Sequence, residues 1–190
     1  FQIMTSGGLV SAQVESSGKS VTVEMGRVSF QSEDIPVSGK SREVLNETLE
    51  INGEEITFSA ATIGNPHCIV LNKNISAQEA GRIGPLLETH SNFPNRTNVQ
   101  FLEVLNRKTI RIEIWERGAG YTLASGSSSS AAAAVAYRLG LCDAKIAVLM
   151  PGGQIDIAIS DNYEITMKGS VTRIGKMILD LECLDFEIPA

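Results

Sequence analysis

One stretch of the sequence, Trp115–Gly140, constrains the fold of this chain more than any other. It leaves the strand-like run Thr109–Ile114, passes through the glycine-rich turn Arg117–Gly120, and then opens onto an apolar helix. The first backbone N–H groups of a helix have no partner within the helix, and the helix dipole favours negative charge beside them. Gly126 has no Cβ and lets the backbone approach a ligand closely. The stretch therefore predicts an anion-binding helix start.

The run SGSSSSAAAA within this stretch also has the composition of a flexible Ser/Ala linker. Two features favour a helix instead. The alanines continue into Val135–Leu139 and stop at Gly140, a residue type that commonly ends helices. A helix with small side chains on nearly every side also packs closely among strands. We therefore expect a buried central helix at about residues 126–139.

Composition limits the classes of partner. The 190 residues are enough for one substantial domain, or one and a part. A net charge of −6 without a Lys/Arg cluster argues against nucleic acid as a partner. No apolar run approaches the roughly 20 residues that span a bilayer, and no signal peptide is visible, which argues against a membrane partner.

The cysteines indicate the compartment. Cys68, Cys142 and Cys183 are odd in number and have no C-x-x-C spacing. This pattern argues against a disulfide framework and against a zinc site, so no metal is expected. A reducing cytosol fits best, and we predict a cytoplasmic protein. Cys68 lies in an apolar strand and is expected to be an inert core thiol.

The rest of the chain reads mainly as short strands. The first 30 residues suggest three of them, and the chain opens inside one without an initiator Met, which is typical of a fragment or of a chain that has lost a preceding part. Residues 31–50 look like a crossover, and residues 171–184 like a final strand. Glu116 shares the parity of the preceding isoleucines and should point inward.

The second predicted helix starts at the capping box Ser76-x-x-Glu79, and Gly84–Pro85 should kink or restart it. Many short strands with two helices, one of them apolar all round, favour an α+β fold. We expect a β-barrel or strongly curled sheet wrapped around the central helix.

Four short blocks carry a family resemblance. In chain order they are Gly64–His67, Arg96–Asn98, Glu116–Gly120 and Thr122–Gly126. Their identity, order and spacing closely resemble the diaminopimelate epimerase family, and Pro151–Gly153 and the opening Thr5–Gly8 fit as well.

The resemblance implies an isomerase that inverts the α-carbon of an amino acid without pyridoxal phosphate or any other cofactor. The family reaction converts LL- to meso-diaminopimelate in lysine and peptidoglycan biosynthesis. The family fold has two pseudo-symmetric domains, each a barrel around a central helix, with the active site between them. Residues 1–30 would then be strands remaining from the N-terminal domain, 31–175 the C-terminal barrel domain, and 176–190 a strand returning to the N-terminal domain.

The chain departs from the family pattern in two ways. The N-terminal domain with the first catalytic cysteine is largely missing, so it would be supplied in cis or by a partner chain; a homodimer is also compatible. The second catalytic cysteine falls at Ser125, and a further family cysteine at Ser130. A serine hydroxyl is a much weaker acid than a thiol and a poor base without a partner. We therefore expect this polypeptide to be impaired as a two-thiol epimerase.

The resemblance also implies roles for individual residues. The substrate would be a small amino acid with an α-carboxylate. Its polar ends would contact Asn65, Asn98, Glu116 and Arg117, and the backbone of Gly126 and Ser127 would hold the carboxylate. The catalytic positions would be Ser125, His67 and Glu116.

Structural alternatives stay open for these residues. Asn65 before a proline is typical of a turn, and His67 could be a hydrogen-bonded turn histidine. Glu116 and Arg117 could form a structural ion pair, and Ser127–Ser130 could simply cap the helix.

Three functional alternatives also remain. One is a single-base dehydratase or isomerase of the same fold, and another is a non-catalytic amino-acid-binding paralogue. A serine hydrolase is disfavoured, because residues 125–130 lack a G-x-S-x-G elbow.

Overall fold

The structure is a computed structural model that describes residues 1–5, 8–180 and 182. Its helices are α1 (Ala77–Glu88) and α2 (Gly126–Arg138). Its strands are β1 (Gln2–Thr5), β2 (Gly8–Val14), β3 (Ser20–Arg27), β4 (Glu47–Ile51), β5 (Glu54–Thr62), β6 (Pro66–Leu71), β7 (Asn98–Asn106), β8 (Thr109–Glu116), β9 (Gly120–Thr122), β10 (Lys145–Met150), β11 (Gly153–Ile159) and β12 (Glu164–Ser170). No helix among the described residues is long and apolar enough to cross a membrane.

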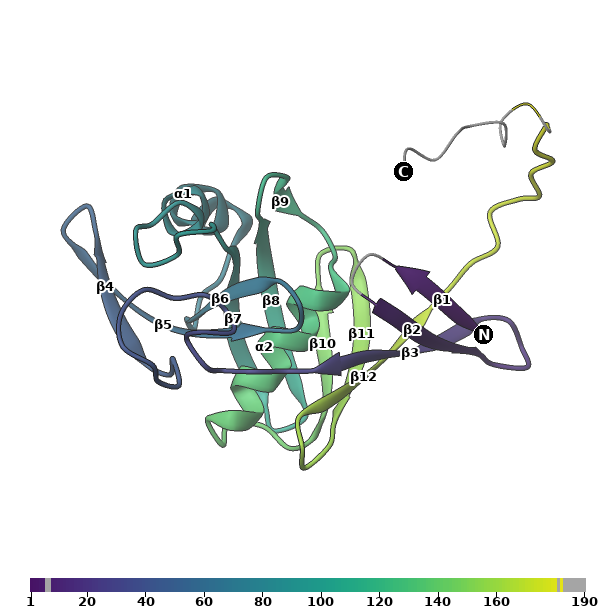
Figure 1. Ribbon diagram of the computed structural model, residues 1–190, viewed down its shortest axis with the longest axis horizontal. Coiled ribbons are helices and arrows are strands. Elements are labelled where there is room, and N and C mark those ends of the chain that lie inside the picture. The colour runs from purple at the N-terminus through teal and green to yellow at the C-terminus, as the bar shows by residue number, and fades with distance from the viewer. Residues whose placement is uncertain (6–7, 181, 183–190) are drawn as a thin grey trace.

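The strands form one mixed sheet in the order β1-β2-β3-β12-β11-β10-β8-β7-β6-β5-β4, with β9 paired to β8. The pairs β6–β7 and β8–β10 are parallel. Just after β3, Ser29 pairs with Thr62 at the end of β5 through two backbone hydrogen bonds of 3.0 and 2.9 Å. The chain that leaves β3 therefore also reaches a strand far along the sheet order, and the strands curve around α2 (Figure 1).

Helix α2 packs against this sheet and contacts strands β5 to β8 and β10 to β12. Residues Ala131–Ala136 are fully buried, because methyl-sized side chains let strands approach the helix from several sides. The helix ends at Leu139 as C-cap, and Gly140 follows in the left-handed region at φ 72°. The predicted buried helix is confirmed, and the linker interpretation is wrong.

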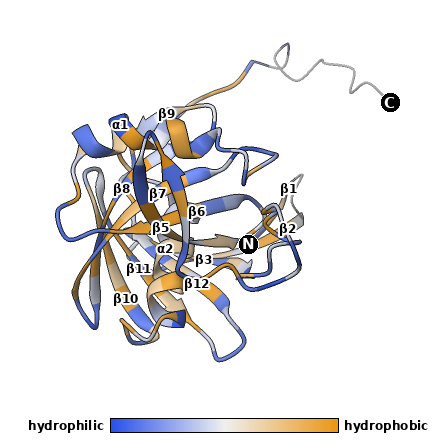
Figure 2. Cartoon of the chain, turned by 90° about the vertical axis from the view of Figure 1, so that its left-hand side faces the viewer, coloured by the Kyte–Doolittle hydropathy of each residue, from blue (hydrophilic) through white to orange (hydrophobic). Residues whose placement is uncertain are grey.

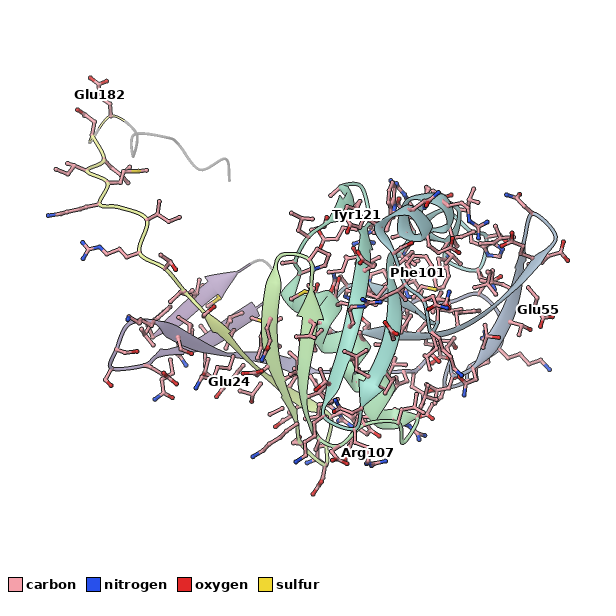
Figure 3. All side chains as sticks on the ribbon, turned by 180° about the vertical axis from the view of Figure 1, so that it is seen from behind. Glu24, Glu55, Phe101, Arg107, Tyr121 and Glu182 are labelled. Atoms are coloured by element: carbon pink, nitrogen blue, oxygen red, sulfur yellow. The ribbon has the colours of Figure 1, made fainter. Side chains whose placement is uncertain are left out.

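Helix α1 packs on the opposite face of β7 and β8 and covers a second hydrophobic cluster. Phe101 of β7 points into this cluster, as Figure 3 shows. Successive side chains of β7 and β8 point to opposite faces of the sheet and so contribute to both hydrophobic clusters. Ile110, Ile112 and Ile114 face α2. Figure 2 shows the resulting pattern, with hydrophobic segments along the strands and hydrophilic residues mainly in the loops.

The start of α1 agrees with the prediction and its middle does not. Ser76 is the N-cap, and its Oγ accepts a 3.1 Å hydrogen bond from the N–H of Glu79. We expected a kink or restart at Gly84–Pro85; the helix is continuous through Pro85, so the predicted restart is wrong. Proline leaves the carbonyl four residues earlier without a helical partner, and that residue, Gly81, is exposed to solvent. Water can therefore replace the lost bond.

Two strand predictions also need correction. Strand β4 occupies the end of the segment that we expected to be a crossover. Residues 171–180 form no strand, contrary to the prediction for 171–184; residues 181, 183 and 184 lie outside the described part of the chain. A strand needs a neighbour for its N–H and C=O groups, and this segment leaves Ile174, Met177, Ile178 and Leu179 exposed.

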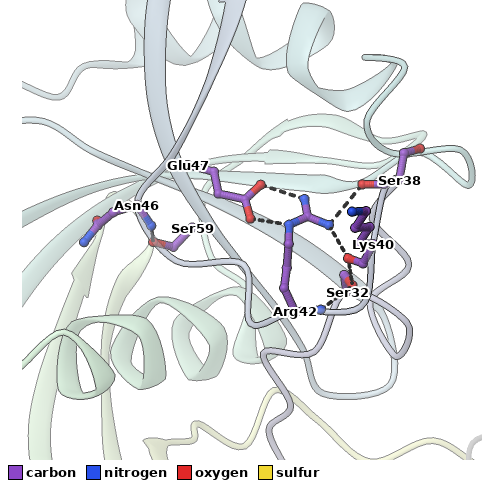
Figure 4. A network of polar contacts seen from close by, with 7 residues as sticks. All are labelled: Ser32, Ser38, Lys40, Arg42, Asn46, Glu47 and Ser59. Atoms are coloured by element: carbon purple, nitrogen blue, oxygen red, sulfur yellow. Dashed lines mark hydrogen bonds and ion pairs between the residues drawn. The ribbon is translucent and has the colours of Figure 1, made fainter.

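The segment between β3 and β4 is held by one arginine (Figure 4). Arg42 binds both carboxylate oxygens of Glu47, at 2.6 and 2.7 Å. The third guanidinium nitrogen donates to the carbonyls of Ser38 and Lys40. Each end of this planar fork meets an acceptor, so the loop is fixed in one conformation.

Replacing Arg42 should therefore destabilise the fold. For Arg42→Ala we expect a loss of about 1–2 kcal/mol in the free energy of unfolding, because the ion pair is partly exposed and two loop carbonyls lose their donor. Urea unfolding measures this. Arg42→Lys keeps the charge but not the fork and should recover only part of the loss. An Arg42→Ala variant as stable as the wild type would contradict this account.

Candidate active site at the start of helix α2

The serine-rich first turn of α2 has distinct roles for its hydroxyl groups. Ser125 is the N-cap in extended conformation, and its Oγ accepts a 3.5 Å hydrogen bond from the N–H of Ser128. The hydroxyls of Ser129 and Ser130 donate back to the carbonyls of Ser125 and Gly126, both at 2.8 Å. The structural alternative in which Ser127–Ser130 cap the helix is thus not supported, since Ser125 is the cap and the others belong to the helix.

Gly126 packs against the end of the Met167 side chain. A Cβ at this position would lie 2.8 Å from the Sδ atom of Met167, so this flexible side chain would have to move aside. This packing is compatible with the predicted approach of the backbone to a ligand.

The turn between β5 and β6 faces this helix start. Gly64 takes a φ of 103°, a conformation that favours glycine, and Asn65 follows. The Asn65 amide donates to Ser127 Oγ at 3.5 Å and contacts His67 Nε2 at 3.0 Å. The geometry thus brings three predicted site residues, Asn65, His67 and Ser127, into one contiguous group.

His67 is fully buried and neutral. Burial lowers its pKa to about 4, an interaction with Gln100 opposes the fall, and the positive charge of Arg117 adds to it. Its Nδ1 atom has no hydrogen-bond partner among the described residues, and the same holds for Gln100 Oε1. At neutral pH this histidine therefore carries one ring proton rather than two.

Asn98 joins the loops that border the site. Its Nδ2 donates to the carbonyl of Pro66 at 2.8 Å, and its Oδ1 accepts from the N–H of Arg117 at 3.0 Å. The residue is 6% exposed. Asn98 was predicted as a substrate contact; its bonds to two backbone segments give it a role in holding those segments side by side.

Glu116 and Arg117 diverge at the end of β8. Glu116 is half-buried, whereas Arg117 is exposed and donates to the carbonyl of Asn95 at 3.0 Å. The described contacts include no ion pair between them, so that structural alternative is not supported. Gly118 and Gly120 adopt left-handed conformations in the turn between β8 and β9.

The buried carboxylate of Glu88, at the end of α1, anchors this turn and was missed in the sequence. It accepts hydrogen bonds from Trp115 Nε1 at 2.7 Å and from the N–H of Gly118 at 2.8 Å, and it pairs with Arg96. Burial pushes the pKa of this carboxyl up, but these donors outweigh it and hold the pKa below its usual value. Glu88 lies four residues after Gly84, which indicates in the sequence that both lie on the face of α1 that packs on the sheet.

The thiols of the described region are poorly suited to proton transfer. Cys68 is completely buried, and burial raises its pKa far above the usual range for a thiol. Burial also raises the pKa of Cys142. The prediction of Cys68 as an inert core thiol is confirmed. Cys183 lies outside the described residues.

Taken together, the site is a half-buried helix start that contacts the amide of Asn65, with the buried imidazole of His67 behind that amide. Unpaired N–H groups and a helix dipole suit an anionic group such as a carboxylate. Among the described residues no cluster of three or more His, Cys, Asp or Glu side chains could hold a metal ion.

Comparisons of the sequence agree on one family. The profile described as diaminopimelate epimerase matches residues 59–174, more than half of the chain. Diaminopimelate epimerase 2 of Nostoc sp. is 56% identical over 187 residues, covering 98% of this chain and 66% of that protein. Diaminopimelate epimerase of Alkaliphilus metalliredigens is 37% identical over 179 residues, covering 93% of this chain and 63% of that protein.

Solved structures share the fold at low identity. A probable proline racemase from Agrobacterium radiobacter superposes with a TM-score of 0.65 at 15% identity, covering 97% of this chain and 61% of that one. A hydroxyproline epimerase from Agrobacterium vitis superposes with a TM-score of 0.60 at 16% identity, covering 89% of this chain and 55% of that one.

The fold is therefore one that proteins described as racemases and epimerases adopt. Within that class the chain belongs to the diaminopimelate epimerase family, as the blocks around Asn65, Asn98 and Glu116 indicated. It spans just under two thirds of the length of the curated relatives it matches, 66% and 63% for the two above.

Proposed function

We propose that this chain forms the C-terminal half of the active site of a cytoplasmic, cofactor-independent amino-acid epimerase acting on diaminopimelate. The observation that carries the proposal is the convergence of Asn65, His67 and Ser127 at the open start of α2. A carboxylate held there by backbone N–H groups would help to stabilise negative charge that develops at the neighbouring α-carbon. Gly126 and Ser127 would supply those groups, and Arg117, Glu116, Asn65 and Asn98 would surround the polar ends of the substrate.

We further propose that the sheet is a β-barrel closed around α2, one of two pseudo-symmetric domains. The Ser29–Thr62 bridge and the contacts of α2 with seven strands support closure. An N-terminal domain, in cis or on a partner chain, would complete the cleft, with residues 1–30 and 176–190 belonging to it. The exposed apolar residues Phe1, Met4 and Leu9 support a further packed layer on β1 and β2.

Ser125 occupies the position of a family catalytic cysteine and limits the reaction. Restoring the thiol tests this. In the full-length protein, Ser125→Cys should raise incorporation of solvent deuterium at the α-carbon of diaminopimelate by about 10²-fold or more, since a positioned acid–base group contributes about that much. Mass spectrometry of the recovered substrate measures it.

Ser129→Cys is the matched control, because it makes the same change four residues along the helix, where the hydroxyl bonds to a backbone carbonyl. Ser129→Cys should not increase the incorporation of deuterium. A folded Ser125→Cys protein with no gain would remove the two-thiol mechanism.

The serine itself favours a second candidate, a single-base dehydratase or isomerase of the same fold. In that case turnover would proceed without inversion at the α-carbon and without need of a thiol at residue 125. A binding paralogue would instead retain a carboxylate ligand without turnover, and Arg117→Ala should abolish that binding.

A further inference from the structure

Two buried side-chain atoms near His67 have no hydrogen-bond partner among the described residues. They belong to residues on the neighbouring strands β6 and β7. His67 Nδ1 and Gln100 Oε1 have no partner among the described residues, and both side chains are fully buried. In the parallel β6–β7 register Ile69 lies opposite Gln100, so His67 and Gln100 face α2 from adjacent strands. Gln100 raises the pKa of His67, as an amide oxygen facing the ring does, so the two side chains lie within reach of each other. Turning the amide keeps this proximity and reverses the sign of the effect. A buried polar atom without a partner destabilises the fold, so both atoms are expected to have one.

Two complete assignments of the protons are conceivable, because the oxygen and nitrogen of an amide side chain are assigned from their partners. In the first, the Asn65 amide is turned, so that it donates to His67 Nε2 while Nδ1–H donates to Gln100 Oε1. In the second, the Gln100 amide is turned, so that its N–H donates to His67 Nδ1 while Nε2–H donates to Asn65 Oδ1. The two give opposite tautomers of the imidazole.

Ser128 distinguishes the two assignments. Its side chain is fully buried, and its hydroxyl contacts Gln100 Nε2 at 3.0 Å. Unlike Ser129 and Ser130, it makes no bond back to a helix carbonyl among the described contacts. In the first assignment the Ser128 hydroxyl only accepts, so its proton is left without an acceptor. In the second, the turned Gln100 oxygen accepts that proton, and both imidazole nitrogens and the Ser128 hydroxyl have partners.

We propose that Gln100 is a positioning residue that holds His67 as the neutral Nε2–H tautomer. The hydrogen bonds then run from Ser128 through Gln100, His67 and Asn65 to Ser127, beginning and ending on the first turn of α2. The lone pair of His67 is already occupied by Gln100, so the ring presents a donor and not a base to the site. Its meaning for catalysis rests on the function proposed above; there His67 would orient Asn65 rather than remove a proton.

Imidazole NMR tests the proposal without substrate or turnover, so failure of the epimerase proposal would not affect the result. The chain has two histidines, and His90→Asn assigns the signals of His67. Long-range ¹H–¹⁵N correlation near neutral pH should show the His67 proton on Nε2. A proton on Nδ1, or on both nitrogens, would overturn the proposal.

Two variants test whether Gln100 is the cause. Gln100→Glu replaces a donor by an acceptor and should move the proton to Nδ1, while Gln13→Glu, an exposed change, should not. If Gln100→Glu fails to fold, Ser128→Ala serves instead: it removes the donor that orients the amide, so signals of the second tautomer should appear. An unchanged tautomer in every folded variant would exclude Gln100 as the controlling residue.

Discussion

Glu88→Ala should reduce the free energy of unfolding by about 2–4 kcal/mol, the largest loss expected for a single polar side chain here. Glu88 is 4% exposed, and its carboxylate accepts hydrogen bonds from Trp115 and Gly118, which lie on the strand and turn that border the site. Removing it leaves both N–H groups without their acceptor. Arg96 is half-exposed and can turn to water, which keeps the loss below that of a fully buried pair.

The contribution of Glu88 should also depend on pH. Because the folded state holds the pKa of this carboxyl below its usual 4.5, the stabilisation is fully present above about 4.5. It is lost as the pH falls through the folded-state pKa. Urea unfolding of wild type and Glu88→Gln should therefore give a stability difference that is constant near neutral pH and shrinks below about 4.5.

The exposed Glu54 provides the matched control for this experiment. It pairs with Arg82 at 3.1 Å with a side chain 53% exposed, so Glu54→Gln should change stability by about 0–1 kcal/mol. A difference between wild type and Glu88→Gln that does not vary with pH would show that the ionised carboxylate is not what holds the turn.

Gly84→Ala should destabilise the fold by about 1–3 kcal/mol even though alanine is the better helix former. A Cβ at Gly84 would lie 2.6 Å from both Cβ and Cγ of Trp115. These atoms are close to the backbone of β8 and cannot move aside as the end of a flexible side chain could. Helix α1 would have to shift away from the sheet, which would also strain the bond between Glu88 and Trp115.

Gly81→Ala in the same helix should change the free energy of unfolding in the opposite direction. Nothing lies within 4 Å of a Cβ built at Gly81, and the residue is exposed. The helix propensity gained should stabilise the protein by about 0.5–1 kcal/mol. Thermal or urea unfolding of the two variants measures the contrast, and two changes of the same sign would contradict the packing explanation.

Several features could be predicted because they depend on nearby residues. The capping box at Ser76 and the helix stop at Gly140 are encoded within one turn of chain. The burial of α2 also followed from the size of its side chains, since only a helix with small residues on most sides fits inside curved strands. The family blocks also include Asn65 and His67, whose side chains contact each other at 3.0 Å.

Other predictions failed or were missed because they depend on what a segment meets in space. Pro85 does not break α1, since the carbonyl it leaves unpaired faces solvent. Residues 171–180 contain several apolar residues, yet beyond the bond from the N–H of Val171 to the carbonyl of Lys19 no backbone pairing is described for them. The role of Gln100 was missed. It lies two residues after Asn98, so both side chains point to the same face of the strand, and this was only a weak indication of a role.

The sequence by itself determined where α1 begins, where α2 begins and ends, that α2 is buried, and which family the chain belongs to, because these depend on local backbone preferences and on patterns read along the chain. Only the tertiary structure decided that Glu88 holds a turn 30 residues further along and that Gln100 meets both His67 and the start of α2. Burial makes a polar atom depend on its partner, and the partner is selected by how strands and helices pack rather than by their order in the chain.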